Sequence, residues 1–164
     1  MEMQSLQDLF VDNLKDLYSA EKQILKAGPK ISKAVENEDL RSALDEHLRI
    51  TEKQVDRLER IFKKLGEKPT GKKCHGMEGL IEENKELLGE DAEQEVLEAG
   101  LIVGQQKVEH YEIAGYGSCA TFAKLMGDDE AAQLLGQSLE EEKQADKMLT
   151  QIAEQINVQA QHPA

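Results

Sequence analysis

Several glutamates occupy positions where the helical pattern of the sequence predicts an apolar face. An α-helix turns about 100° per residue, so each polar residue can be placed against the apolar stripe of its own segment. Glu21 falls inside one stripe of leucine and isoleucine, and Glu142 falls inside another with Asp146 beside it. Glu109 and Glu112 fall within the broad apolar arc of a third segment. The pattern therefore directs carboxylates from three helices toward the interior.

The inward polar residues also lie at one height. Each is within about one turn of the midpoint of its predicted helix, given the rise of a helix per residue. In the fourth helical segment Thr51 lies at the centre of the stripe, with His47 and Gln54 on one flank. Four helices would thus bring polar groups to the same level of the core.

A single inward glutamate in a chain with 33 acidic residues is most simply a side chain that reaches solvent. Several at one level would repel one another and lose their hydration unless they pair with or hold a cation. Oxygen-rich ligation with one or two imidazoles suits iron, manganese or zinc. On this argument Glu142→Gln should stabilise the metal-free protein, because it removes one repelling charge.

Apolar residues recur at three- and four-residue steps in four long segments, residues 3–35, 39–65, 93–126 and 129–156. A shorter amphipathic helix is predicted at 77–88. Pro29 lies inside the first segment and should kink or split it, because proline cannot donate a helical hydrogen bond. Gly104 and Gly115 lie on the stripe of the third long segment, where we expect them to let a neighbouring helix approach closely.

The connectors define the architecture. Short polar links at 37–39 and 127–129 make two antiparallel hairpins, and residues 67–91 join them through the short helix. One long crossover between the second and third long helices is the ferritin-like arrangement, whereas an up-down bundle has only short loops. We therefore expect an all-α, ferritin-like four-helix bundle with a crossover that carries an extra short helix. It forms a single domain over residues 1–164, with 157–164 as a flexible tail.

Composition and charge exclude several classes of partner. The formal net charge is −13, which opposes binding to nucleic acid or to an anionic membrane surface. No apolar run is long enough to span a bilayer, and the N-terminal residues lack the pattern of a signal peptide. Cys74 and Cys119 match no metal-binding spacing, so we expect free thiols and a cytoplasmic protein.

The sequence resembles a known family. Its inward carboxylates resemble those of ferritin-like di-iron proteins, and its motifs resemble more closely the bacterial YciF family, named after a stress-associated protein. The resemblance spans most of the chain and implies a di-iron or other divalent metal centre, with a stress-associated function linked to oxygen or peroxide. It rests on five stretches, 16–23, 46–48, 77–83, 107–113 and 139–143.

The sequence departs from the ferritin-like pattern at one point. Those proteins use Glu-x-x-His on two helices, and no Glu-x-x-His occurs in this chain. His47 would have to supply nitrogen instead, and Asp146 an additional oxygen. An altered di-metal site, a mononuclear site and a metal-poor site all stay open. The candidate metal ligands are Glu21, His47, Glu109, Glu112, Glu142 and Asp146.

Two functions follow from this resemblance. One is a metal-binding protein whose bound metal does redox chemistry, and the other is a non-enzymatic stress or assembly protein that keeps the fold without a working metal site. A homodimer is expected in both cases. His110 points away from the predicted core and is expected at the surface or in a dimer contact.

Overall fold

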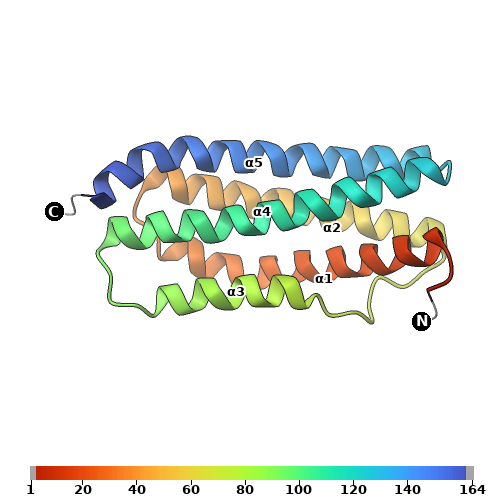
Figure 1. Cartoon of the computed structure of the whole chain (residues 1–164), viewed down its shortest axis with the longest axis horizontal. Coiled ribbons are helices and arrows are strands. Elements are labelled where there is room, and N and C mark those ends of the chain that lie inside the picture. The colour runs from red at the N-terminus through yellow and green to blue at the C-terminus, as the bar shows by residue number, and fades with distance from the viewer. Residues whose placement is uncertain (1–2, 162–164) are drawn as a thin grey trace.

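The structure is a computed structural model that describes residues 3–161 of the chain. The described part is built from helices and loops, as the sequence predicted (Figure 1). Four helices are long and one is short. Their bounds are α1 (Leu6–Lys33), α2 (Glu38–Leu65), α3 (His75–Leu88), α4 (Gln94–Leu125) and α5 (Asp129–Gln161).

Local capping chemistry defines the helix ends. The side chains of Ser5 and Asn37 accept hydrogen bonds from the first turns of α1 and α2, at 3.1 and 3.0 Å. Asp128 does the same for α5 by accepting from the Ala131 amide at 3.0 Å. Such caps satisfy amides that have no partner within the helix. Gly66 ends α2 with φ of 68°, a left-handed conformation that favours glycine.

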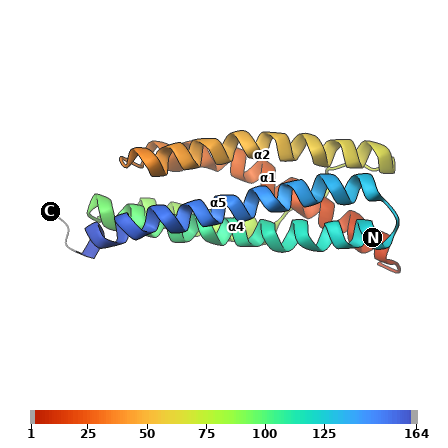
Figure 2. The same ribbon diagram turned by 90° about the horizontal axis from the view of Figure 1, so that it is seen from above.

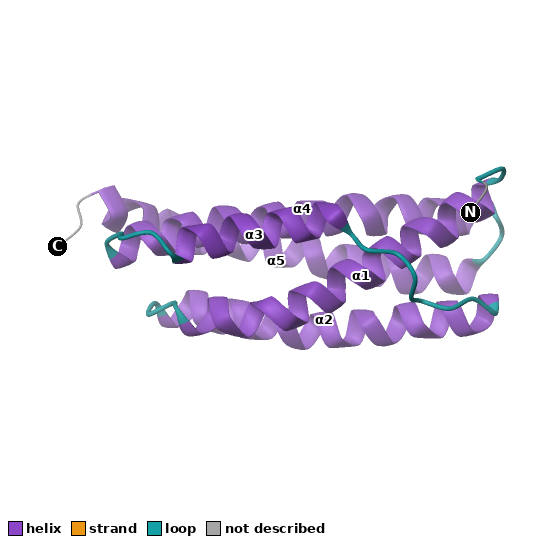
Figure 3. Cartoon of the chain, turned by 90° about the horizontal axis from the view of Figure 1, so that it is seen from below, coloured by secondary structure: helices purple, strands orange, loops and turns teal. Residues whose placement is uncertain are grey.

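The chain follows the predicted crossover topology. Helices α1 and α2 form one antiparallel hairpin and α4 and α5 form the other, while α2 and α4 run in the same direction (Figures 1 and 2). After α2 a loop runs back along the bundle to α3, which packs against α1 and α4 (Figure 3). This is the ferritin-like arrangement, with α3 as the extra helix of the crossover.

Two apolar clusters fill the bundle on either side of a layer of buried polar residues. One cluster includes Phe10, Phe62 and Tyr116, and the other includes Leu40 and Leu101. On every long helix the inward polar residues lie in sequence between members of these two clusters. The hydrophobic effect therefore fixes both ends of the bundle, and the polar layer is held between them.

Helical structure continues through two stretches where the sequence predicted that it could break or end. Helix α1 passes through Pro29 without splitting, because the proline is exposed and its ring projects away from the core. Helix α5 continues to Gln161 and so includes most of the predicted flexible tail. The fully buried Ile156 anchors its last turns in the second cluster. Residues 162–164 lie outside the described part of the chain.

The predicted roles of Gly104 and Gly115 are confirmed. A Cβ atom on Gly104 would lie 1.7 Å from Oδ1 of Asn84 in α3, and one on Gly115 would lie 2.6 Å from Leu17 in α1. Both glycines thus allow a neighbouring helix to approach the backbone of α4. Between residues 3 and 161, no helix combines the length and the apolarity needed to cross a lipid bilayer.

Candidate metal centre

Five ionisable side chains from the four long helices meet at the middle of the bundle, and we call them the polar layer. Their exposed fractions are 0% for the four glutamates and 4% for the histidine. The four helices are fixed by the apolar clusters above and below, so these side chains are buried in the middle of the bundle. The layer consists of Glu21 from α1, His47 from α2, Glu109 and Glu112 from α4, and Glu142 from α5.

His47 lies at the centre of this layer. Its Nε2 is 3.1 Å from Oε2 of Glu109, 3.2 Å from Oε2 of Glu142 and 3.7 Å from Oε2 of Glu112. The ligand atoms of these four residues all lie within 4.8 Å of one another. A buried group of this composition could hold a metal ion. Glu21 lies next to it, close to the carboxyl group of Glu112.

Neutral side chains orient the ionisable ones. Gln54 donates from Nε2 to Oε1 of Glu142 at 2.7 Å, and Gln105 donates from Nε2 to Oε1 of Glu109 at 2.8 Å. The Tyr116 hydroxyl donates to Oε1 of Glu21. Each of these bonds fixes one oxygen of a carboxylate and leaves the other directed at the layer. Partners of this kind commonly position metal ligands.

Several oxygens of the layer have no hydrogen-bond partner. They are Oε2 of Glu21 and both carboxyl oxygens of Glu112, and Oε2 of Glu109 has only its ion-pair contact with His47. A buried carboxylate oxygen without a partner is costly, and buried charges in proteins are normally paired or bound to metal. The unpartnered oxygens therefore fit a bound cation, which supplies the missing positive charge.

Burial dominates the protonation of three glutamates. Desolvation raises the pKa of Glu21 to about 7, against the effect of the neighbouring Glu112 and Tyr116 side chains, which lower it. Desolvation likewise raises the pKa of Glu109 to about 8. The pKa of Glu112 is raised well above its ordinary value by burial and then by the charges of Glu142 and Glu21. Without a metal, these carboxyl groups favour the protonated form.

Glu142 and His47 form the ionised pair of the layer. Burial raises the pKa of Glu142, but the neighbouring side chains of Glu109, His47 and Gln54 outweigh it and lower that pKa to about 2. Burial lowers the pKa of His47, but Glu109 and Glu142 outweigh it and raise that pKa well above its ordinary value. In the absence of metal, the imidazolium serves as the internal counter-charge of Glu142.

The structure brings together five of the six predicted ligands and leaves out Asp146. Asp146 is half-buried on the outer side of the α4–α5 contact, where its Oδ2 lies 3.2 Å from Nε2 of His110. Its Oδ1 accepts from Gln106 at 3.2 Å. The side chain is one turn from Glu142 but rotated toward α4, so its carboxylate faces this surface pair. His110 is exposed, as predicted.

Sequence reasoning missed two partners of the layer. Tyr116 lies on the apolar arc of its helix, a position that by itself favours packing in the core, and the other two tyrosines bond elsewhere. In the structure Tyr18 bonds to Glu59, and Tyr111 bonds to Asp16 at 2.5 Å. Tyr116 lies four residues from Glu112 on the same helix face, and this spacing could have revealed it. Gln105, four residues before Glu109, carries the same signal.

The polar residues of α2 have different roles. Thr51 is buried as predicted, but its hydroxyl donates to the backbone oxygen of His47 at 2.9 Å and is not aimed at the layer. Gln54 also donates to Glu141 at 3.2 Å, and Glu141 accepts two bonds from Arg57 at 2.6 and 2.7 Å.

The predicted free thiols are confirmed, because Cys74 and Cys119 form no disulfide and are both buried.

Comparison with known proteins places the chain among helical-bundle relatives. A family model described as a domain of unknown function, DUF892, matches residues 5–162. The chain is 43% identical to the Escherichia coli protein YciF over 166 residues, which cover all of both proteins. The crystal structure of that E. coli stress protein has a TM-score of 0.90 and covers 94% of this chain and 98% of its own.

Two further solved structures are similar. YcfI from Rhodopseudomonas palustris is 44% identical, with a TM-score of 0.87 and coverage of 91% of this chain and 95% of its own. A protein from Xanthomonas campestris has a TM-score of 0.74 at 20% identity and covers 94% of this chain and 95% of its own. At that identity, the likeness shows the fold alone.

Proposed function

Since the chain belongs to the DUF892 family, together with E. coli YciF, we propose that its polar layer binds divalent metal and that this binding is its function. A pair of iron ions is the leading composition, and manganese or zinc are the alternatives. We assign the protein to the response to stress, by analogy with the relative whose structure is titled a stress protein.

One observation carries this proposal. Three carboxylate oxygens, on Glu21 and Glu112, are buried without a hydrogen-bond partner, and a fourth, on Glu109, has only His47 beside it. A chain that only needed a stable bundle would be better served by apolar side chains at this level, since buried charge is costly. A cation accounts for the composition of the layer.

The residues divide between two positions for metal. His47, Glu109, Glu112 and Glu142 would hold one ion, because their ligand atoms are mutually close. Glu21 and Glu112 would hold a second, since Glu112 neighbours both groups and has two unpartnered oxygens. Gln54, Gln105 and Tyr116 would keep the carboxylates oriented.

The protein would position the metal ligands and exclude water from the polar layer. A bound iron pair would provide redox chemistry toward dioxygen or peroxide. Burial of the layer limits access to small molecules, and His47 holds a proton at Nε2 that must leave before this atom can bind metal. Metal binding should therefore release protons from the layer.

A specific observation favours a second function. The side-chain amide of Gln54 donates a hydrogen bond directly to Glu142. Together with His47 it satisfies Glu142 without any metal. A non-enzymatic stress or assembly protein that retains the bundle without a working metal site is the alternative.

Metal content distinguishes the two. The protein is stripped with chelator, reconstituted anaerobically with Fe²⁺ and separately with Mn²⁺, and analysed for bound metal after desalting. We expect at least one ion per chain, and stoichiometry near zero with both metals would overturn the proposal. Glu109→Gln should lose most of the bound metal. Asp146→Asn is the matched control and should keep it, because Asp146 lies outside the layer.

Titration with Co²⁺ measures the number of metal positions, because the absorption bands of bound Co²⁺ depend on the ligands of each position. Titration of the stripped protein should saturate in two steps if both positions fill. Glu21→Gln should abolish only the second step. The predicted homodimer is checked on the same samples by light scattering after size exclusion.

A further inference from the structure

The two hairpins of the bundle meet along two helix–helix contacts, the α1–α4 seam and the α2–α5 seam. Only the first of these seams is covered by another helix. Helix α3 packs against α1 and α4 and makes no comparable contact with α2 or α5, so it closes the α1–α4 seam. No other described helix or loop lies over the α2–α5 seam (Figures 1 and 2). The crossover therefore leaves one side of the polar layer less protected.

A cavity of about 240 Å³ lies in the open seam, and we call it the inner cavity. It enters between α2 and α5 and reaches residues of the far helix α4. Its lining includes His47 and Glu109 of the polar layer together with Gln105, which bonds to Glu109. The inner cavity thus extends from the α2–α5 surface to the proposed ligands.

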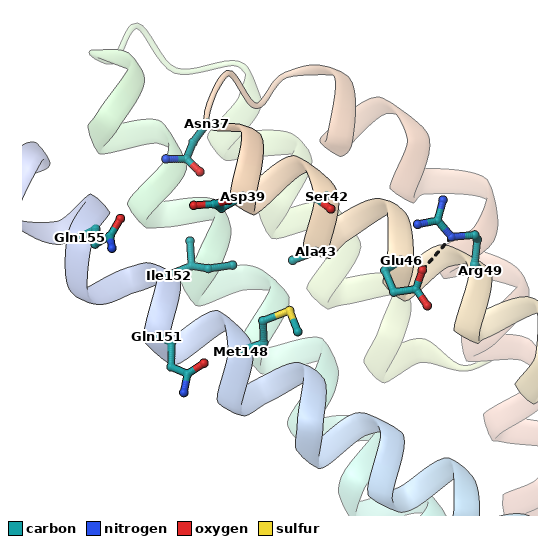
Figure 4. Close-up of a pocket in the computed structure, with 10 residues that line it drawn as sticks. All are labelled: Asn37, Asp39, Ser42, Ala43, Glu46, Arg49, Met148, Gln151, Ile152 and Gln155. Carbon is teal, nitrogen blue, oxygen red and sulfur yellow. Dashed lines mark hydrogen bonds and ion pairs between the residues drawn. The ribbon is translucent and has the colours of Figure 1, made fainter.

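A wider depression of about 470 Å³, the outer groove, lies further along the same seam (Figure 4). It shares Ala43, Glu46 and Met148 with the inner cavity, so the two spaces adjoin. Figure 4 shows the Met148 side chain extending from α5 into the space beside Ala43. Met148 therefore lies where the outer groove meets the inner cavity.

The passage suits an uncharged molecule. The two carboxylates of the inner cavity that lie outside the polar layer are paired, Glu46 with Arg49 at 2.8 Å and Glu141 with Arg57 at 2.6 Å. A desolvated ion would be strongly disfavoured along an apolar wall, whereas a small neutral solute would not. The apolar part of the wall consists of Leu44, Ile50, Ala145 and Leu149.

We infer that the α2–α5 seam is the entry route by which a small uncharged solute, of the size of dioxygen or hydrogen peroxide, reaches the His47–Glu109 edge of the polar layer. Its purpose rests on the proposed metal binding, but the route itself belongs to the metal-free protein. Ala145 keeps the inner cavity open because its side chain is small. Met148 controls the entrance, since its flexible thioether side chain can change rotamer without moving the helix.

Dissolved dioxygen is a suitable probe, because it is small, uncharged and paramagnetic. Its effect on the relaxation of methyl signals is measured by NMR in the metal-free protein under oxygen pressure. The methyl groups of Leu44 and Leu149 should relax several-fold faster than those of Leu58, although all three are buried. The His47 ring protons should respond as well. A bulky gadolinium chelate should leave all of these signals unaffected.

Two substitutions should move this effect in opposite directions. Ala145→Leu fills the inner cavity and should reduce the oxygen effect at Leu149 and His47 several-fold. Met148→Ala should increase it, and this residue is 49% exposed, so the bundle should tolerate the change. Ala27→Leu is the matched control. It makes the same change in a cavity between α1 and α3 that includes no polar-layer residue, and it should leave the oxygen effect unchanged.

The outcomes separate the route from the metal. Oxygen effects at Leu44, Leu149 and His47 no greater than at Leu58 would overturn the route, even if the protein binds iron. Equal effects in Ala145→Leu and wild type would overturn it too. A protein that binds no metal but shows the expected oxygen pattern would refute the proposed function and leave the route established.

Discussion

Gln54 donates a hydrogen bond from Nε2 to Oε1 of Glu142 over 2.7 Å, and this bond distinguishes Glu142 from Glu112. Glu142 also faces His47, and its neighbours Glu109, His47 and Gln54 lower its pKa to about 2, against the opposing effect of burial. Glu112 has no partner for either oxygen, and burial raises its pKa well above the ordinary value. Two equally buried glutamates of the same layer thus have opposite electrostatic roles.

The same substitution at these two positions should have opposite effects on the metal-free protein. Glu112→Gln should raise the free energy of unfolding at pH 7, because an amide at this buried position carries no charge to desolvate. Glu142→Gln should lower it by about 1–3 kcal/mol, because an amide group would then face the donors of Gln54 and His47. Urea unfolding followed by circular dichroism in the presence of chelator measures both.

From its position on the helix alone, Glu142→Gln was predicted to stabilise the metal-free protein. The contacts of Glu142 with Gln54 and His47 reverse this prediction. If both variants shifted the free energy of unfolding in one direction, the division of the layer into a paired and an unpaired glutamate would be wrong. With metal present, both variants should gain less stability than the wild type, because each has lost a proposed ligand.

The stability of the metal-free protein should fall as pH rises from 5 to 8. Burial raises the pKa of Glu21 to about 7 and of Glu109 to about 8, whereas both start near 4.5 when unfolded. Between these values the folded chain binds more protons than the unfolded chain, so raising the pH favours unfolding. His47 adds to this slope, because its raised pKa contributes stability below 6.5 that is lost at higher pH.

Thermal melts with chelator across this pH range provide the measurement. Glu109→Gln is the control and should show a shallower decline, since one of the titrating groups is gone. Added metal should stabilise the protein more at pH 8 than at pH 5, because the ligands must lose their protons to bind it. A pH-independent melting temperature without metal would contradict the raised pKa values.

The helices and most of the candidate site could be predicted because both depend on one regularity, the 100° turn of a helix. Once the stripe of α1 is known, Glu21 has a single possible direction, and the same holds for Glu142 in α5. The crossover followed from the length of the 67–91 linker. These features are local and need no knowledge of neighbouring helices.

Features that depend on how helices face each other could not be predicted in this way. Asp146 lies at the edge of its stripe, so the close packing of α4 against α5 decides which way it points, and it points to His110. Helix α4 is apolar over a broad arc because it is packed by α1, α3 and α5. The angular position of Tyr116 on this helix therefore did not distinguish it from the apolar residues of the core. The partners of the layer became apparent only in three dimensions.

Tyr116→Phe should destabilise the metal-free protein by about 1–3 kcal/mol, because it removes the hydrogen bond to Glu21 and leaves that carboxyl group without any partner. It should also weaken binding at the second metal position. Tyr18→Phe removes a hydroxyl that bonds to exposed Glu59 and should change stability by no more than about 0.5 kcal/mol. Similar losses in the two variants, measured by urea unfolding, would argue against a special role for Tyr116.

The last prediction concerns the glycine that lets α3 cover the α1–α4 seam. In a helix interior, replacing glycine by alanine normally stabilises by up to about 1 kcal/mol. At Gly104 the new Cβ would lie 1.7 Å from Oδ1 and 2.7 Å from Cγ of Asn84, which is 3% exposed and has little room to move. The overlap should outweigh the gain, so Gly104→Ala should destabilise by about 1–2 kcal/mol.

Gly136→Ala supplies the control, because it lies inside α5 and no atom would lie within 4 Å of the added Cβ. It should stabilise the protein by about 0.5–1 kcal/mol. Hydrogen exchange should show α3 alone losing protection in Gly104→Ala, since Asn84 holds that helix against α4. If both variants stabilised the bundle equally, α3 would be shown to adjust to a side chain at position 104. The packing of α3 over the α1–α4 seam would then not require a glycine at position 104 of α4.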